Sequence, residues 1–318
     1  MKKYFTKEAF KNGFKLLTGA FNGFLDDKGL KLSASLAYYT VFSLAPLLLL
    51  MISVAGAIYG KDAINNKIFG EINGLVGNDA AKQIQDMIKN VSLSGKTTSA
   101  VVIGGITLLF GATSVFAEIQ DSINTIWKVK AKPKRGWLKL IQDRLLSSSL
   151  IVGLGFLLIV SLVVNGMVLA LSGILTRFLP DITVIFVQAI NLIISFLVIT
   201  VLFGVIFKVL PDVKIGWKDV RSGALFTAVL FMIGRFLIGL YISTTGTGST
   251  YGAAGSLIVI LVWVYYTAAI LYFGAEFTQV YAEYKGVKIE PANYAVHVQQ
   301  TEVEKDVAVL PPTNKIDK

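Results

Sequence analysis

Long runs of apolar residues, separated by short polar segments, make up most of the chain. A run of about 18 or more apolar residues is long enough to cross a lipid bilayer as a helix. Runs of this length lie at about 34–60, 98–117, 145–172, 182–209, 222–242 and 252–276. The pattern predicts an all-α, polytopic integral membrane protein with six transmembrane helices and amphipathic surface helices.

Two amphipathic segments accompany the predicted spans. Near the N-terminus, apolar side chains recur at helical spacing among lysines, at Phe5, Phe10, Phe14, Leu17 and Phe21. Residues 1–31 are therefore predicted to form an amphipathic helix, which either lies on the membrane surface or packs on the bundle as an ordinary surface helix. Residues 62–92 have the spacing of two short amphipathic helices on the outer surface, which either cover helix ends or roof an outward-facing cavity.

Three regions follow from this pattern. Residues 1–31 are expected to form a cytoplasmic amphipathic segment, and residues 32–284 the six-helix transmembrane domain. Residues 285–318 are polar and hold three prolines. Because such a segment buries little apolar surface, it is predicted to be a disordered cytoplasmic tail.

The distribution of charge gives the chain an orientation. The net charge is +10, and residues 1–31, 118–144 and 208–221 hold seven, seven and four lysines and arginines. The alternate segments 173–181 and 243–251 hold one and none. Because Lys and Arg accumulate on cytoplasmic flanks, both termini are predicted to be cytoplasmic. The basic flanks are expected to bind anionic inner-leaflet headgroups, at about 1 kcal/mol per cation, and not nucleic acid.

Composition argues against several kinds of chemistry. The chain has no cysteine, and His297 is its single histidine. Disulfides and thiolate metal sites are therefore excluded, and histidine-based metal binding or acid–base catalysis has almost no support. We expect no catalytic residue, no metal and no cofactor, and a protein that is not an enzyme.

Polar side chains inside the predicted spans are candidates for function. Arg235 lies about thirteen residues into the fifth run, roughly 20 Å from its inner end, and a charge at that depth usually faces protein or water. Alternatively, its long side chain reaches the outer headgroups. The candidate substrate path comprises Arg235, Tyr265, Tyr266, Tyr38 and Tyr39. For the central tyrosines, the alternative is a structural hydrogen bond to a neighbouring helix.

Helix ends at the cytoplasmic face carry a second set of charged residues. Two glutamates end helices that run inwards, and an arginine opens the third span at the same level. The candidate cytoplasmic ion-pair ring comprises Glu118, Asp121, Arg144 and Glu276. Such a ring either clamps the helices in register or opens as a gate. In the first span, Pro46 removes an intrahelical hydrogen bond and is predicted to bend the helix.

Four motifs, in order along the chain, resemble one known family. They are ASLAYYTVFSLAPLLLL, GATSVFAEIQDSINTIW, LPDVKIGWKDVRSGALFTA and STYGAAGSLIVILVWVYYTAAILYFGAEFTQVYA. Together they resemble the YihY/BrkB family of bacterial inner-membrane proteins, over about residues 15–284. The resemblance implies a six-helix protein of the bacterial plasma (inner) membrane without established catalytic residues. One member of that family is tied to serum resistance and another to export of lipid A precursors.

These features favour a transporter or flippase of an amphipathic or anionic, lipid-like substrate of the cell envelope. The bent first span, Arg235 and the basic inner flanks support transport, while the lipid-like substrate rests on analogy with the family. The alternative is a structural or envelope-maintenance membrane protein whose polar residues fix the bundle. A ribonuclease, an older label of the family that is regarded as mistaken, is disfavoured because the chain lacks a His/Asp metal cluster and a phosphate-cradling Gly-Lys motif.

Overall fold

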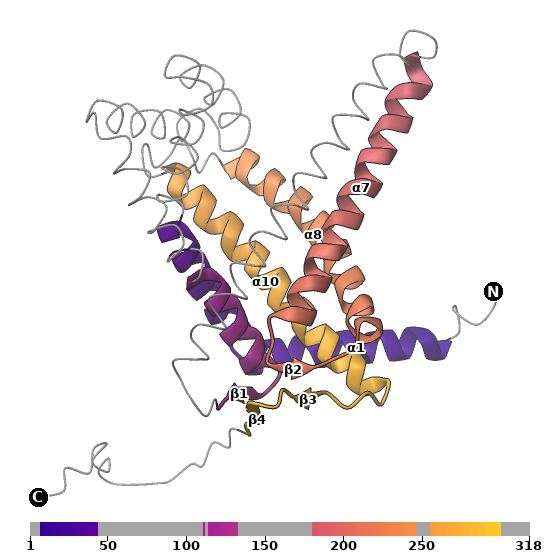
Figure 1. The fold of residues 1–318 in the computed structure, drawn as a ribbon. Coiled ribbons are helices and arrows are strands. Elements are labelled where there is room, and N and C mark those ends of the chain that lie inside the picture. The colour runs from indigo at the N-terminus through magenta and orange to yellow at the C-terminus, as the bar shows by residue number, and fades with distance from the viewer. Residues whose placement is uncertain (1–6, 44–110, 112–113, 133–179, 246–254, 300–318) are drawn as a thin grey trace, which may run out of the picture.

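A computed structural model describes residues 7–43, 111, 114–132, 180–245 and 255–299. Within these ranges the protein is an all-α membrane protein with a small layer of strands at one end (Figure 1). The helices are α1 (Lys7–Asp26), α7 (Pro180–Val209), α8 (Trp217–Thr245) and α10 (Gly255–Tyr284), and residues 29–43 and 114–126 are also helical. The strands are β1 (Val129–Ala131), β2 (Val213–Lys214), β3 (Glu290–Pro291) and β4 (Ala295–His297).

Of the described residues, three helices are long and apolar enough to cross a membrane. These stretches are Leu192–Val209 in α7, Trp217–Ile238 in α8 and Ile258–Tyr284 in α10. They coincide with the last three predicted runs. The first predicted run begins in the helical residues 29–43, and the second ends in the helical residues 114–126.

The remaining sequence predictions about the spans fall on other parts of the chain. Residues 62–92, the third run at 145–172, Pro46 and Arg144 lie outside the described residues. The six-span count, the bend at Pro46 and the role of the 62–92 segment therefore stay predictions.

The N-terminal helix α1 runs across the ends of the long helices, on the side of the bundle where the strands lie (Figure 1). It packs on α10 through a face of small residues. A methyl group placed on Gly19 would lie 3.3 Å from Cγ1 of Val280, and one on Gly23 would lie 2.6 Å from Oε2 of Glu276. Ala20, between them, is fully buried. The small side chains let the two backbones approach closely, as Gly-x-x-x-Gly faces do in membrane proteins.

A second face of α1 is apolar and uncovered. Phe14, Leu17, Phe21 and Leu25 are between 41% and 66% exposed. Their spacing of three and four residues places them in one stripe. In the structure, α1 packs on α10, as the second interpretation of the N-terminal segment describes, and the same helix keeps an exposed apolar stripe.

Helices α8 and α10 are joined by two reciprocal contacts. The side chain of Thr278 on α10 occupies the space beside Gly223 of α8, and the side chain of Thr227 on α8 occupies the space beside Gly274 of α10. Each threonine hydroxyl donates a 2.7 Å hydrogen bond to a backbone carbonyl of its own helix, four residues earlier. Both polar groups are therefore satisfied inside the interface, as membrane helices require.

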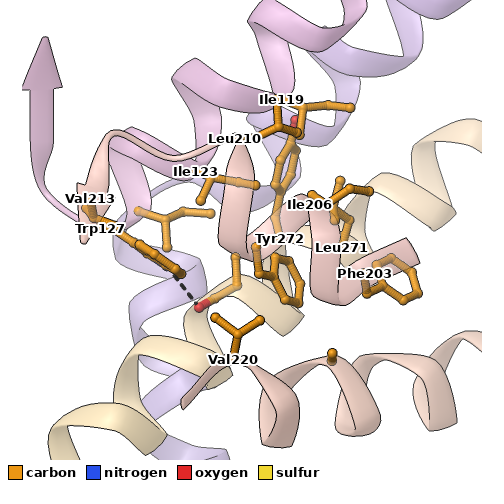
Figure 2. Close-up of a cluster of buried hydrophobic side chains, with 14 of the residues drawn as sticks. Ile119, Ile123, Trp127, Phe203, Ile206, Leu210, Val213, Val220, Leu271 and Tyr272 are labelled. Carbon is orange, nitrogen blue, oxygen red and sulfur yellow. Dashed lines mark hydrogen bonds between the residues drawn. The ribbon is translucent and has the colours of Figure 1, made fainter. Parts of the chain in front are cut away.

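The buried core lies at the strand end of the bundle. Figure 2 shows side chains of the helical residues 114–126, of α7, α8 and α10, and of the segment after α7 meeting there. Phe207 and Tyr272 are fully buried, and Ile123 and Val220 close the same cluster. Toward the other end, α7 diverges from α8 and α10 (Figure 1), and its residues Leu192–Val201 include side chains that are 48–60% exposed.

The strands form two short antiparallel ladders. β1 pairs with β4, with Lys130 opposite Val296, and β2 pairs with β3, with Lys214 opposite Glu290. The prediction of a disordered tail over residues 285–318 is therefore wrong for residues 285–299, whose strands are held under the helix ends. Residues 300–318 lie outside the described residues.

Candidate functional site

A buried carboxylate, Asp212, joins three distant segments of the chain at the strand end of the bundle. Its side chain accepts hydrogen bonds from Gln120 Nε2 at 3.1 Å, from Asn124 Nδ2 at 2.9 Å and from the Tyr294 hydroxyl at 3.0 Å. Asp212 is 2% exposed. Gln120 and Asn124 are one helical turn apart, so both amides project from the same face of their helix.

The backbone of Asp212 takes part in the same arrangement. Its N–H donates a 2.8 Å hydrogen bond to Asn124 Oδ1, and its carbonyl accepts one of 2.9 Å from the N–H of Ala292. Directional contacts thus fix together the turn after α7, the helical residues 114–126 and the C-terminal segment that contains Ala292 and Tyr294. We call Gln120, Asn124, Asp212 and Tyr294 the Asp212 hub.

A second buried carboxylate, Glu276, lies where α1 crosses α10. It is 3% exposed, and its Oε1 has no hydrogen-bond partner among the described residues. Its Oε2 lies against the backbone of Gly23. The charged groups close enough to interact electrostatically with Glu276 are Asp27, Lys128 and Asp26.

The lysine near Glu276 already has another partner. Lys128 Nζ forms an ion pair with Asp27, whose side chain is 9% exposed. Lys128 has a backbone φ of 54°, the left-handed conformation that ends the preceding helix. The indole N–H of Trp127 donates a 3.2 Å hydrogen bond to the carbonyl of Ala275, shown dashed in Figure 2. This bond fixes the end of that helix beside Glu276.

The structure rearranges the predicted ion-pair ring. Glu276 lies beside Asp27 and Lys128, two residues that the sequence did not single out, and Arg144 lies outside the described residues. Asp121 is exposed and lines an open pocket of about 460 Å³ at the end of its helix and the start of the strand layer. The other lining residues are Asn124, Thr125, Lys128, Val129, Lys130, Ala131 and Val298. Glu118 is half-buried and interacts electrostatically with Tyr272, which lies one turn before Glu276 in α10.

Arg235 lies in the half of α8 that is farther from the strands. In α7, α8 and α10 we call this half the outer half and the half nearer the strands the inner half. It is exposed, and it is surrounded along the helix by the exposed apolar residues Ile233, Phe236 and Leu237. Among the described residues, no ion pair joins Arg235 to a carboxylate.

An aromatic contact layer lies one turn below Arg235. Phe231 of α8 meets Phe203 of α7 edge-on, with ring centroids 5.9 Å apart, and meets Trp263 of α10 edge-on at 6.4 Å. These three rings join the three long helices where the inner packing gives way to the exposed outer half. They form a layer of rings between Arg235 and the Asp212 hub.

The candidate tyrosines fall into two separate groups. Tyr266 packs on Gly234 at the α8–α10 interface, where an added methyl would lie 2.8 Å from its ring and 3.1 Å from its hydroxyl. Gly234 directly precedes Arg235 in the sequence. Tyr265 is half-buried on the same helix. Tyr38 and Tyr39 are 59% and 41% exposed and contact each other, with centroids 5.8 Å apart.

The sequence analysis missed the members of the Asp212 hub and the two neighbours of Glu276. The motifs that contain Gln120, Asn124 and Asp212 could be recognised in the sequence. Their sequences gave no indication that these three side chains contact one another. Within the described ranges, no group of three or more histidines, aspartates and glutamates is placed to hold a metal ion.

Comparisons with known proteins agree with this architecture. The model of the family described as virulence factor BrkB matches residues 20–297. A UPF0761 membrane protein of Tolumonas auensis is 28% identical over 261 residues, which are 80% of this chain and 81% of that protein. A UPF0761 membrane protein of Azotobacter vinelandii is 27% identical over 80% of this chain and 60% of that protein. Another, from Stenotrophomonas maltophilia, is 26% identical over 84% of this chain and 61% of that protein.

The chain spans about 60% of the length of several of these relatives. No solved structure matches the chain. The family model covers nearly the whole chain, including the Asp212 hub and the crossing of α1 and α10. The chain therefore belongs to the virulence factor BrkB family of membrane proteins.

Proposed function

We propose that this protein moves an amphipathic, anionic, lipid-like substrate across or between the leaflets of the bacterial inner membrane. The observation that carries the proposal is Arg235, which is exposed in the outer half of a membrane-length helix and forms no ion pair with a described carboxylate. A charge at bilayer depth costs several kcal/mol, so it usually marks an ion or substrate pathway.

The chemistry of this position suits an anionic headgroup attached to acyl chains. An arginine stays charged at any relevant pH and binds a phosphate or carboxylate through two parallel hydrogen bonds. The exposed side chains of Ile233, Phe236 and Leu237 offer apolar surface on the same helix. A headgroup at Arg235 would therefore have its chains beside apolar residues and in the lipid.

The packed inner half supplies the barrier that a transporter needs. Phe203, Phe231 and Trp263 close the space between the three helices below Arg235. Beneath them lie the buried side chains of Asp212, Gln120 and Asn124 and the buried apolar core. In this proposal the described arrangement is open on the outer side of the rings and closed on the inner side.

The orientation and partners belong to the same proposal. The Lys/Arg distribution supports cytoplasmic termini, a strand layer on the cytoplasmic side and contacts of the basic segments with anionic inner-leaflet lipids. Reporter fusions after residues 31, 90, 135, 178, 214 and 247 should then alternate between inside and outside. Two consecutive fusions that report the same side would contradict the six-span topology.

A lipid translocation assay tests the transport proposal directly. Purified protein is reconstituted into vesicles of phosphatidylethanolamine and phosphatidylglycerol that contain headgroup-labelled phosphatidylglycerol, and the label that becomes accessible from outside is followed in time. Arg235→Gln should slow translocation roughly ten-fold or more, because it removes a charge-assisted pair of hydrogen bonds. Arg235→Lys should retain part of the rate, since the charge remains.

The matched control is Arg221→Gln, which removes an exposed arginine near the start of the same helix. It should leave the rate unchanged. A structural role in envelope maintenance, favoured by the rigid Asp212 hub, predicts instead that the wild-type protein moves the probe no faster than protein-free vesicles. It also predicts that all three variants behave alike.

A further inference from the structure

We propose that Glu276, together with Asp27, binds one monovalent cation, a proton or a sodium ion, at the crossing of α1 and α10. The site goes beyond the proposed transport function and lies at the opposite end of the bundle from Arg235. Glu276 is 97% buried, and its Oε1 points to no hydrogen-bond donor among the described residues.

The packing around Glu276 gives it a fixed position but no cationic partner of its own. Its Oε2 lies against Gly23, at a distance where a methyl group on that glycine would be only 2.6 Å away. A side chain larger than hydrogen at position 23 would therefore displace the carboxyl group. The glycine face of α1 thus serves two purposes, since it brings the helices together and makes room for the carboxyl group.

The charges that face Glu276 do not balance. Asp26 and Asp27 come from the end of α1, and Lys128 comes from the end of the helical residues 114–126. Lys128 is paired with Asp27, and Asp26 is exposed at the protein surface. The buried pair of carboxyl groups therefore shares one ammonium group, and one negative charge is left without compensation.

A buried carboxylate without a partner is costly, and the cost is removed by a proton or by a bound cation. A proton would convert Glu276 into a donor that reaches a neighbouring oxygen, such as the carboxylate of Asp27. A sodium ion is a hard cation that would take oxygen ligands from the same two carboxyl groups. Either cation stabilises the contact between α1 and α10, and its loss leaves two carboxylates repelling each other across that contact.

Infrared spectroscopy of the full-length protein in lipid nanodiscs distinguishes the two cations. A protonated Glu276 gives a carboxylic-acid C=O band at neutral pH in sodium-free buffer, and this band should be missing from Glu276→Gln. If sodium is the ligand, the band is weak, and replacing choline chloride by sodium chloride at equal ionic strength raises the melting temperature by roughly 2–4 °C.

Two variants control for folding and for unrelated carboxylates. Glu276→Gln keeps the size of the side chain, so its melting temperature should lose its dependence on sodium and most of its dependence on pH. Glu283→Gln, about two helical turns further along α10, changes an exposed carboxylate that accepts a hydrogen bond from Gln279. It should keep the wild-type band and the wild-type responses.

The proposal is overturned if the wild type and Glu276→Gln share the same carboxylic-acid absorption and the same response to sodium and pH. The wild-type spectrum and its sodium response decide the matter even if the glutamine variant does not fold. Because neither measurement uses substrate, the cation site and the transport role of Arg235 can fail independently of each other.

Discussion

The inner and outer halves of α7, α8 and α10 differ in how well their side chains are buried. In the inner half, side chains of α7, α8 and α10 are buried against each other, and the polar groups of the Asp212 hub are paired. In the outer half, apolar side chains such as Leu192 of α7 and Phe236 of α8 are 60% and 71% exposed. Directional contacts therefore fix the inner half, whereas apolar side chains of the described outer half stay exposed.

The layer formed by Phe203, Phe231 and Trp263 lies where buried side chains give way to exposed ones along the helices. Phe203 is 4% exposed, while Leu197, less than two turns earlier in α7, is 55% exposed. Such a boundary separates a packed half, next to the strands, from a half whose described side chains are more exposed. Substitutions in the inner half should therefore lower the stability of the fold more than substitutions in the outer half.

The largest effect is expected at the closest approach of α8 and α10. Gly274→Leu would place a side chain where Thr227 already lies, and an overpacked interface of this kind cannot relax without moving a helix. We expect loss of the monodisperse folded protein in size-exclusion chromatography. Gly13→Leu is the matched control, because nothing lies within 4 Å of an added methyl there. Equal behaviour of the two variants would contradict the close packing.

Loss of the Asp212 carboxylate should have the next largest effect. Asp212→Ala leaves the donors of Gln120, Asn124 and Tyr294 without their acceptor, at a cost of about 3 kcal/mol. Melting curves should show this loss, and hydrogen exchange should show lower protection of β3 and β4, which the hub fixes. Glu290→Gln, at an exposed position of β3, should leave both measurements unchanged. A native melting temperature for Asp212→Ala would show that the ladders alone hold the C-terminal segment.

A smaller effect is expected from a single hydrogen bond of the inner half. Trp127→Phe keeps an aromatic ring in the core but removes the donor to the carbonyl of Ala275. The expected loss is about 1 kcal/mol, seen as a lower melting temperature. Trp263→Phe, which changes a 40% exposed ring of the boundary layer, should cost less. The reverse order would contradict the contrast between the two halves.

The sequence predicted what depends on local pattern. The spans that correspond to α7, α8 and α10 were predicted because a long apolar run needs no knowledge of its neighbours, and α1 was predicted from its spacing. The strands of residues 285–299 were not predicted, since ladders of two and three residues have no periodicity and Pro291 argued against a strand. Their pairing partners lie in other parts of the chain.

The contacts of the candidate site were predictable only in part. Glu276 was expected to meet a charged partner at the inner end, and it does lie near Lys128, but Asp27 holds that lysine. The Asp212 hub joins residues 88 and 92 positions apart in the sequence. A single sequence contains the amides and the carboxylate but not the packing of helices that brings them together.

The smallest effect on stability is expected at Arg235, although its effect on transport should be large. Its side chain is exposed, no described carboxylate pairs with it, and its helical neighbours are exposed too. Arg235→Gln should therefore change the free energy of unfolding by less than about 0.5 kcal/mol, or raise it, because an unpaired charge at membrane depth is a cost to the fold. Melting curves in detergent, with Arg221→Gln as the matched variant, measure this. A marked loss of stability in Arg235→Gln, with translocation per folded molecule unchanged, would make Arg235 a structural residue. The contrast between a rigid inner half and a functional outer half would then lose its main support.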